Sequence, residues 1–233
     1  MIKRIAILPA RGGSKRVQNK NARLFCGQPM MHYILSAAAR SGLFDEIHVS
    51  TESDYIASVA SHLGFAPKFR RPLHLADDHT PLMPVLRHVL DEFKRRECNF
   101  DQVCLLYACA PLIEPSDLCA ASEVFEQIGA NKVLLAVTAY TTPLEWAFEL
   151  SDDLRLTPDQ PGAFRIRSQD LATKYHNTGT FAFFPAGRIL SDKPNTDDDF
   201  YGYVLPRTKG LDIDTEEDWH FAELLYRGLH GVS

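Results

Sequence analysis

The chain has 233 residues, of which 45% are hydrophobic, and its formal net charge is -5. This length suits one sizeable α/β domain, the negative charge argues against a broadly basic nucleic-acid surface, and no apolar run approaches the about 18 residues of a membrane-spanning helix. The five cysteines form no Cys-x-x-Cys pair and the amino terminus lacks the pattern of a signal peptide, so we expect reduced thiols in a cytoplasmic protein.

Short apolar segments alternate with helical patterns, which is typical of βα units around a mostly parallel sheet. Strands are predicted at residues 4–8, 46–50, 102–107, 132–138 and 179–184. Helices are predicted at residues 30–40, 54–63, 81–95, after Pro115 and at 215–229, with Pro29 at the first helical position of one and Thr80 as the cap of another. Prolines and a glycine interrupt the pattern from about 141 to 165, which predicts an inserted arm in a single domain of residues 1–233.

A glycine pair surrounded by cations follows the first predicted strand, in the segment Arg11-Gly12-Gly13-Ser14-Lys15-Arg16, with Lys20-Asn21 close behind. Glycines allow a ligand to approach the backbone, successive N–H groups can bind an anion, and cations donate charge-assisted hydrogen bonds to phosphate. The spacing matches neither a P-loop nor a dinucleotide-binding fingerprint. The residues alone therefore leave two interpretations, a polyphosphate site and a basic surface loop.

Together with Leu8-Pro9-Ala10, this segment resembles the amino-terminal signature of the CMP-sialic acid synthetase family, the cytidylyltransferases that activate nine-carbon α-keto acid sugars. In that family the loop wraps the triphosphate of CTP. The resemblance implies a nucleotide-diphospho-sugar transferase-like α/β fold with a mostly parallel Rossmann-like sheet, and a homodimer built through the inserted arm. It implies that CTP is contacted by Ala10, Arg11, Gly12, Ser14, Lys15, Lys20 and Asn21.

A second motif, Asp212-Ile213-Asp214-Thr215, precedes the last predicted helix. In an extended segment the two aspartates project to one side while Ile213 points to the core. Paired carboxylates suit Mg²⁺, but Asp214 or Thr215 could equally serve as a helix cap, and the two roles are compatible. The resemblance implies that Asp212 and Asp214 hold the catalytic metal, Mg²⁺ or Mn²⁺ in its place.

Arg71 precedes Pro72, so an extended or turn conformation is predicted for it. A guanidinium there could bind phosphate or a substrate carboxylate, or could belong to a surface arginine pair. The family carries Arg-Pro-x-x-Leu-x-x-Asp at this place. The resemblance implies that Arg71 contributes to nucleotide handling and that Thr80 lies near the cytosine.

Tyr107 ends the third predicted strand, at the carboxyl edge of the sheet where ligands usually bind, and begins the segment Tyr107-Ala108-Cys109-Ala110-Pro111. Its alternative role is that of a core aromatic. Sialic acid enzymes carry a glutamine here, whereas the Tyr-Ala-x-Ala-Pro form is similar to the pseudaminic acid branch. The resemblance implies a sugar contact for Tyr107.

Two further segments, Arg165-Ile166-Arg167-Ser168-Gln169 and Tyr175-His176-Asn177-Thr178-Gly179, also resemble the pseudaminic acid branch. If the first is extended, Arg165, Arg167 and Gln169 share a face that suits the sugar carboxylate. His176 is open to either a substrate contact or a structural role. Asn177 and Thr178 depart from the branch and Asn177 is closer to the sialic acid form, which leaves the sugar open.

The resemblance implies that CTP and a nonulosonic acid, first of all pseudaminic acid, give a CMP-sugar and pyrophosphate for glycosylation of surface glycans or flagellin. The catalytic set is then Arg11, Lys20, Asp212 and Asp214, and the general base is Asp212, a metal-bound hydroxide or no dedicated group. Sialic, legionaminic and Kdo-type acids remain alternative substrates. A nucleotide-binding regulatory relative is the non-enzyme alternative, and the retained aspartate pair argues against it. No nucleic-acid or membrane partner is expected.

Overall fold

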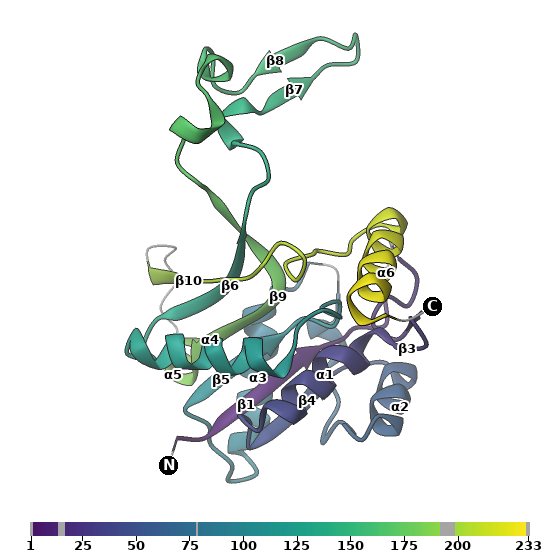
Figure 1. Cartoon of the computed structure of the whole chain (residues 1–233). Coiled ribbons are helices and arrows are strands. Elements are labelled where there is room, and N and C mark those ends of the chain that lie inside the picture. Colours follow the sequence, from purple (N-terminus) through teal and green to yellow (C-terminus); the bar gives the residue numbers. More distant parts are fainter. Residues whose placement is uncertain (1, 14–16, 78, 192–198, 232–233) are drawn as a thin grey trace.

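A twisted sheet of six strands forms the centre of the computed structural model, which describes residues 2–13, 17–77, 79–191 and 199–231 (Figure 1). The strand order is β10-β6-β9-β5-β1-β4. The strands are β1 (Arg4–Pro9), β4 (Glu46–Ser50), β5 (Gln102–Leu106), β6 (Val133–Ala139), β9 (Tyr175–Pro185) and β10 (Phe200–Val204). Neighbouring strands are parallel except that β9 runs antiparallel to both β5 and β6.

Helices cover both faces of the sheet, so alternate residues of β1 are buried in opposite layers. Ala6 and Leu8 pack with α1 (Met30–Ser41), α2 (Asp54–His62) and α4 (Pro115–Gln127). Ile5 and Ile7 pack with α3 (Leu82–Lys94) and α5 (Ala186–Leu190). Burial on both faces explains why these strands read as continuous apolar runs. Within the described ranges, no helix combines the length and the apolar character needed to span a membrane.

The last helix, α6 (Glu216–His230), packs on the amino-terminal loop and on the small hairpin of β2 (Leu24–Phe25) and β3 (Gln28–Pro29). Trp219 is buried there with its ring edge-to-face against Phe25, at a centroid distance of 5.5 Å. Ile213 belongs to the same cluster and is fully buried. This packing holds the carboxyl-terminal acidic motif against the loop that follows β1.

An arm of residues 140–174 leaves the sheet after β6 and returns at β9, projecting from the body of the molecule (Figure 1). It contains β7 (Phe148–Leu150), β8 (Leu156–Pro158) and the short 3₁₀ turns Leu144–Trp146, Ala163–Arg165 and Ser168–Asp170. At its root the N–H of Tyr140 donates to the carbonyl of Lys174 at 3.0 Å. The arm therefore returns to the sheet near residue 174, which is later in the chain than the predicted limit of about 165.

The mostly parallel α/β fold is confirmed, and three local expectations are wrong. Pro29 is the N-cap of α1, which starts at Met30, and does not occupy its first helical position. Thr80 does not cap α3, because the helix starts at Leu82 after an extended Pro81, and the Thr80 hydroxyl instead donates to Asp77 and to the carbonyl of His74. Residues 165–169 do not form one extended segment: Ile166 and Arg167 are extended, but Arg165 ends one 3₁₀ turn and Ser168 begins another. An ion pair between Arg167 and Asp170, at 2.8 Å, closes one of the 3₁₀ turns of the arm.

Candidate nucleotide-binding and catalytic site

A cavity of about 440 Å³ opens where β1 and β5 end, beside the segment that follows β10. This is the carboxyl edge of the parallel strands, the usual ligand site of open α/β sheets. Both cations and carboxylates face into it. The residues predicted as site residues that line it are Arg11, Lys20, Asn21, Arg71, Thr80, Tyr107, Asp212 and Asp214. Ser14 and Lys15, also predicted, lie outside the described residues.

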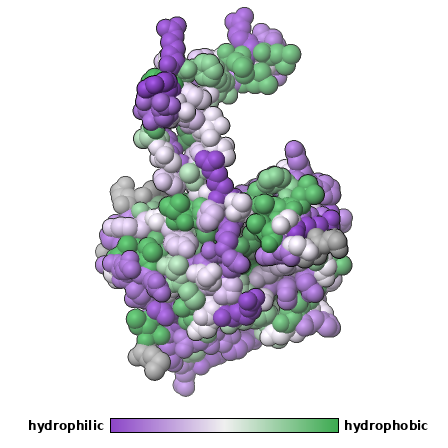
Figure 2. Space-filling model, viewed as in Figure 1, coloured by the Kyte–Doolittle hydropathy of each residue, from purple (hydrophilic) through white to green (hydrophobic). Residues whose placement is uncertain are grey.

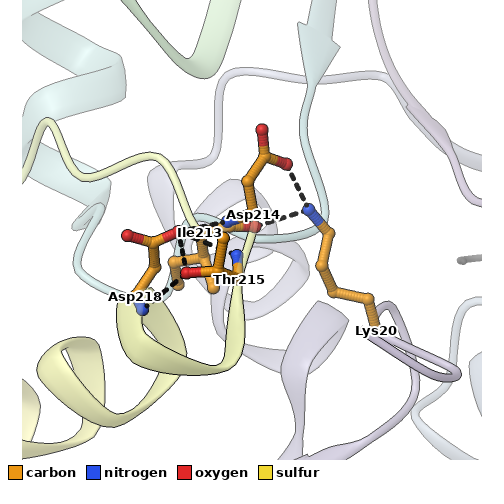
Figure 3. Close-up of polar contacts among 5 residues, drawn as sticks. All are labelled: Lys20, Ile213, Asp214, Thr215 and Asp218. Atoms are coloured by element: carbon orange, nitrogen blue, oxygen red, sulfur yellow. Dashed lines mark hydrogen bonds and ion pairs between the residues drawn. The ribbon is translucent and has the colours of Figure 1, made fainter. Parts of the chain in front are cut away.

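The aspartate motif is fixed from below by the cap of α6 (Figure 3). Thr215 accepts from the N–H of Asp218, and the Asp218 carboxylate accepts from the N–H groups of Thr215 and Asp214, at 2.8 and 3.0 Å. These bonds lower the pKa of Asp218, the largest effect being that of the Thr215 hydroxyl. Because Thr215 and Asp218 supply the capping groups, the Asp214 carboxylate is left to face the cavity.

Lys20 joins the amino-terminal loop to this motif (Figure 3). Its ammonium donates to the carbonyl of Ile213 at 2.5 Å and to Oδ1 of Asp214 at 3.1 Å. A cation therefore lies against a carboxylate in the lining of the cavity. Charge-assisted hydrogen bonds of this kind are among the stronger ones in proteins, so Lys20 and Asp214 stabilise each other's charged form.

Two glycines lie beside the chain segment that carries Asp212, and one of them is closely packed. At Gly210 a Cβ would come within 2.7 Å of Thr178 and 2.9 Å of Thr138, so any side chain would push the segment off β6 and β9. Gly179 has a φ of +60°, and a Cβ there would lie 3.7 Å from Oδ1 of Asp212. The sheet thus leaves room beside the Asp212 carboxylate.

The turn after β1 is held by groups below the cavity. Ala10 is fully buried and its N–H donates to the carbonyl of Ser50 at 2.9 Å, while the N–H of Gly12 donates to Oε1 of Glu52 at 2.7 Å. Asn21 donates to the carbonyl of Arg11 at 3.1 Å. Ala10 and Gly12 therefore shape the turn from outside the cavity lining, and the N–H of Gly12 binds a carboxylate rather than pointing to a phosphate.

Comparison with known proteins identifies the family. The family model described as cytidylyltransferase matches residues 5–183. The chain belongs to the cytidylyltransferase family. Pseudaminic acid cytidylyltransferase of Campylobacter jejuni serotype O:2 is 35% identical over 98% of each chain. The CMP-N,N'-diacetyllegionaminic acid synthase of Legionella pneumophila is 29% identical over 95% of each chain.

A solved structure of CMP:2-keto-3-deoxy-manno-octonic acid synthetase complexed with CTP superposes with a TM-score of 0.71, at 15% identity, over 97% of this chain and 99% of that one. At this identity the similarity supports the fold alone, and it confirms the predicted α/β class for this cytidylyltransferase.

Arg71 and Thr80, both predicted to contact the nucleotide, form hydrogen bonds to other residues of this cytidylyltransferase. Arg71 is buried and donates to the carbonyl and hydroxyl of Ser50, and burial lowers its pKa. The Thr80 hydroxyl and N–H both bind Asp77, whose pKa these bonds lower. Arg11 donates to the carbonyl of Asp77 at 3.0 Å. Arg71 and Thr80 thus line the cavity while also holding its wall.

Tyr107 and Cys109 form the floor of the cavity in this cytidylyltransferase. Burial, and to a lesser extent Asp212, raises the pKa of Tyr107, so the phenol stays protonated at neutral pH and can donate a hydrogen bond. Burial raises the pKa of Cys109 to about 12. That thiol is therefore protonated at neutral pH and a poor nucleophile.

Five predicted sugar contacts lie outside the described lining of this chain's own cavity: Arg165, Arg167, Gln169, His176 and Asn177. The first three stand on the arm. The His176 ring packs against Tyr140 at 4.7 Å, and Oδ1 of Asn177 accepts from the N–H of Gly179 at 3.0 Å. Asn177 therefore stabilises the irregular part of β9 at Gly179, beside Asp212.

The donor set fits Mg²⁺ held jointly with a nucleotide. Two carboxylates, on Asp212 and Asp214, face one cavity, and the described residues contain no group of three or more His, Cys, Asp or Glu side chains able to enclose a metal. Mg²⁺ is usually bound through one or two carboxylates, with phosphates and water completing its shell. Sequence reasoning missed three supporting carboxylates. Glu52 reaches the N–H of Gly12 only in the folded chain. Asp77 and Asp218 bind N–H groups two to four residues away, and their local turn and capping-box patterns are signals that could have found them.

Proposed function

We propose that this cytidylyltransferase transfers CMP from CTP to the anomeric hydroxyl of a nonulosonic acid, with pseudaminic acid as the first choice, and releases pyrophosphate. The observation that carries the proposal is a cavity lined by Arg11, Lys20, Asp212 and Asp214, in which Lys20 binds Asp214. The name and 35% identity of the Campylobacter jejuni relative support the choice of sugar. The five free thiols suit a cytoplasmic enzyme. In this proposal residues 1–233 form a single domain with an inserted arm.

In this proposal the cations receive the triphosphate. Arg11 and Lys20, with Ser14 and Lys15 of the same loop, offset the charge that develops on the leaving pyrophosphate. Asn21 keeps the Arg11 backbone in place through its 3.0–3.1 Å bonds to Arg11 and Met31. Arg71 and Thr80 shape the wall against which the nucleotide lies.

Asp212 and Asp214 would hold the Mg²⁺, or Mn²⁺ in its place. When bound, the ion supplies a positive charge that stabilises the α-phosphate in the transition state and lowers the pKa of the attacking hydroxyl. Asp214 is held in register by Asp218, and Asp212 lies near the protonated Tyr107. Tyr107 is thus placed to donate to a sugar or phosphate oxygen.

The first prediction concerns nucleotide and metal dependence. Pyrophosphate should be released only when CTP, a nonulosonic acid and Mg²⁺ or Mn²⁺ are present together, because the two carboxylates and the cations act on one metal-bound triphosphate. A coupled pyrophosphate assay with each component left out in turn measures this. Undiminished turnover after exhaustive chelation would contradict the metal assignment, and equal rates with ATP, GTP or UTP would contradict the choice of CTP.

The second prediction is a homodimer formed through the arm. Hydrophobic surface lies on the projecting arm (Figure 2). Its exposed large apolar side chains include Phe148, Leu150, Leu154, Leu156, Phe164 and Ile166. An isolated two-stranded hairpin is marginally stable in water, and an exposed apolar patch of this kind marks an interaction surface. Light scattering at micromolar concentration should give twice the chain mass of 26.2 kDa. A monomer would contradict the prediction.

In the proposed dimer, the arm of each chain would reach the cavity of the other chain and bring its residues to the sugar. Arg165, Arg167 and Gln169 would contact the sugar carboxylate in the cavity of a second copy, with His176 and Asn177 at the root of the arm. Arg167 pairs with Asp170 in a single chain, and both side chains are well exposed, so the guanidinium can exchange this partner for a carboxylate of the ligand.

A further inference from the structure

Glu52 connects the turns that follow two adjacent strands. β1 and β4 pair in parallel up to Pro9 and Ser50, and one more backbone bond, from Ala10 to the carbonyl of Ser50, extends the pairing. Among the described residues, no backbone hydrogen bond joins the two segments beyond this point. The Glu52 side chain bridges the gap, since its Oε1 accepts from the N–H of Gly12 at 2.7 Å.

This bridge encloses Arg11. Ala10, just before Arg11, is held by the carbonyl of Ser50, and Gly12, just after it, is held by Glu52. The carbonyl of Arg11 itself accepts from Asn21. With the backbone held on three sides, the Arg11 guanidinium reaches over the cavity to the carbonyl of Asp77 at 3.0 Å. The carboxylate of Glu52 thus contributes to the direction in which Arg11 points.

The same carboxylate carries an energetic cost. Among the described residues, Oε2 of Glu52 is buried without a hydrogen-bond partner. Glu52 lies close enough to Arg71 for an attractive electrostatic interaction, which offsets part of this cost. A buried oxygen left without a partner requires a physical reason, and holding Gly12 below the cavity supplies one.

We propose that Glu52 is a positioning residue for the nucleotide: it fixes the turn of Gly12 so that Arg11 meets the triphosphate. Glu52 itself lies outside the described lining of the cavity and acts through Gly12. The inference rests on the proposed function, because it concerns the binding of CTP.

Calorimetric titration of CTP into four variants tests this role, with thermal melting as a second measurement. Glu52→Ala removes the acceptor and Glu52→Asp keeps the charge but shortens its reach, so both should weaken CTP binding at least ~10-fold, on the scale of a lost charge-assisted bond. Glu52→Gln retains an acceptor and should stay within about 3-fold of the wild type. Ser53→Ala is the matched control, since Ser53 caps α2 in the same turn; it should lower the melting temperature and leave CTP binding unchanged.

The outcomes separate the two proposals. If the wild type does not bind CTP, the proposed function and this inference both fail. If the wild type binds CTP and Glu52→Ala binds equally well, the inference alone fails. If Glu52→Ala does not fold, the other two Glu52 variants decide. Strong CTP binding by Glu52→Asp together with weak binding by Glu52→Gln would overturn the inference, because the effect would then depend on charge and not on the bond to Gly12.

Discussion

Replacing Asp214 by Asn is expected to reduce turnover at least ~100-fold, the scale seen when an electrostatic element of an active site is removed. The substitution is nearly isosteric but removes the charge that faces Lys20 and the proposed metal ion. The backbone of Asp214 is held by Asp218 through an N–H that asparagine also has, so the fold should survive. Pyrophosphate release and thermal melting measure the two effects.

Thr215→Ala is the matched control for this variant. It removes the hydroxyl that caps α6, which typically costs about 1 kcal/mol of stability, while both aspartates remain. The melting temperature should fall and turnover should stay within about 3-fold, because a lost cap acts on the folded population and not on the reacting atoms. If Asp214→Asn keeps wild-type turnover, or loses activity only in proportion to a lowered melting temperature, the motif serves as a helix cap and not as a metal site.

Lys20→Met is the variant with the second largest expected effect, a loss of turnover on the order of 100-fold. Methionine approximates the length of the lysine stem but cannot donate to Asp214 or to a phosphate. The loss of its positive charge should be felt most when negative charge develops on the leaving group. Single-turnover measurements at saturating CTP would show the effect on the chemical step.

Arg23→Met provides the comparison for Lys20. Arg23 is a cation of the same region, but it pairs with Glu216 and stacks at 4.5 Å over Trp219, outside the described cavity lining. Its replacement should change turnover by no more than about 3-fold. Equal losses in both variants would mean that Lys20 acts through general surface charge and not at the site.

The sequence predicted the site best where the relevant residues are close along the chain. Asp212 and Asp214 share a face because they are two residues apart, and the buried Ile213 between them anchors the motif in the core. The glycine and lysine loop directly follows the first predicted strand along the chain, and the turn after β1 does line the cavity through Arg11. Lys20 and Asp214 meet across nearly the whole chain. The family resemblance implied that both act at the CTP site, but it did not predict the hydrogen bond between them.

What the sequence could not reveal depends on contacts between turns. Glu52 reads as an ordinary polar residue until β1 and β4 are placed side by side, and only then does its side chain reach Gly12. β9 runs antiparallel because the arm returns the chain at the same edge of the sheet where β6 ended, and strand periodicity does not encode this direction. Alternation predicted one face for residues 165–169, whereas local bonds such as Arg167 with Asp170 produce turns.

The most direct test of the proposed reaction is the identification of its product. The purified protein, CTP and Mg²⁺ should be incubated with pseudaminic acid and, in parallel, with legionaminic acid, sialic acid and Kdo, and the products separated and weighed by mass spectrometry. We expect a CMP-linked sugar and an equal amount of pyrophosphate, with the highest kcat/KM for pseudaminic acid. A higher kcat/KM for another acid would contradict the choice of sugar. The absence of a CMP-linked product with all four acids, from a protein that is folded and binds CTP, would contradict the account as a whole.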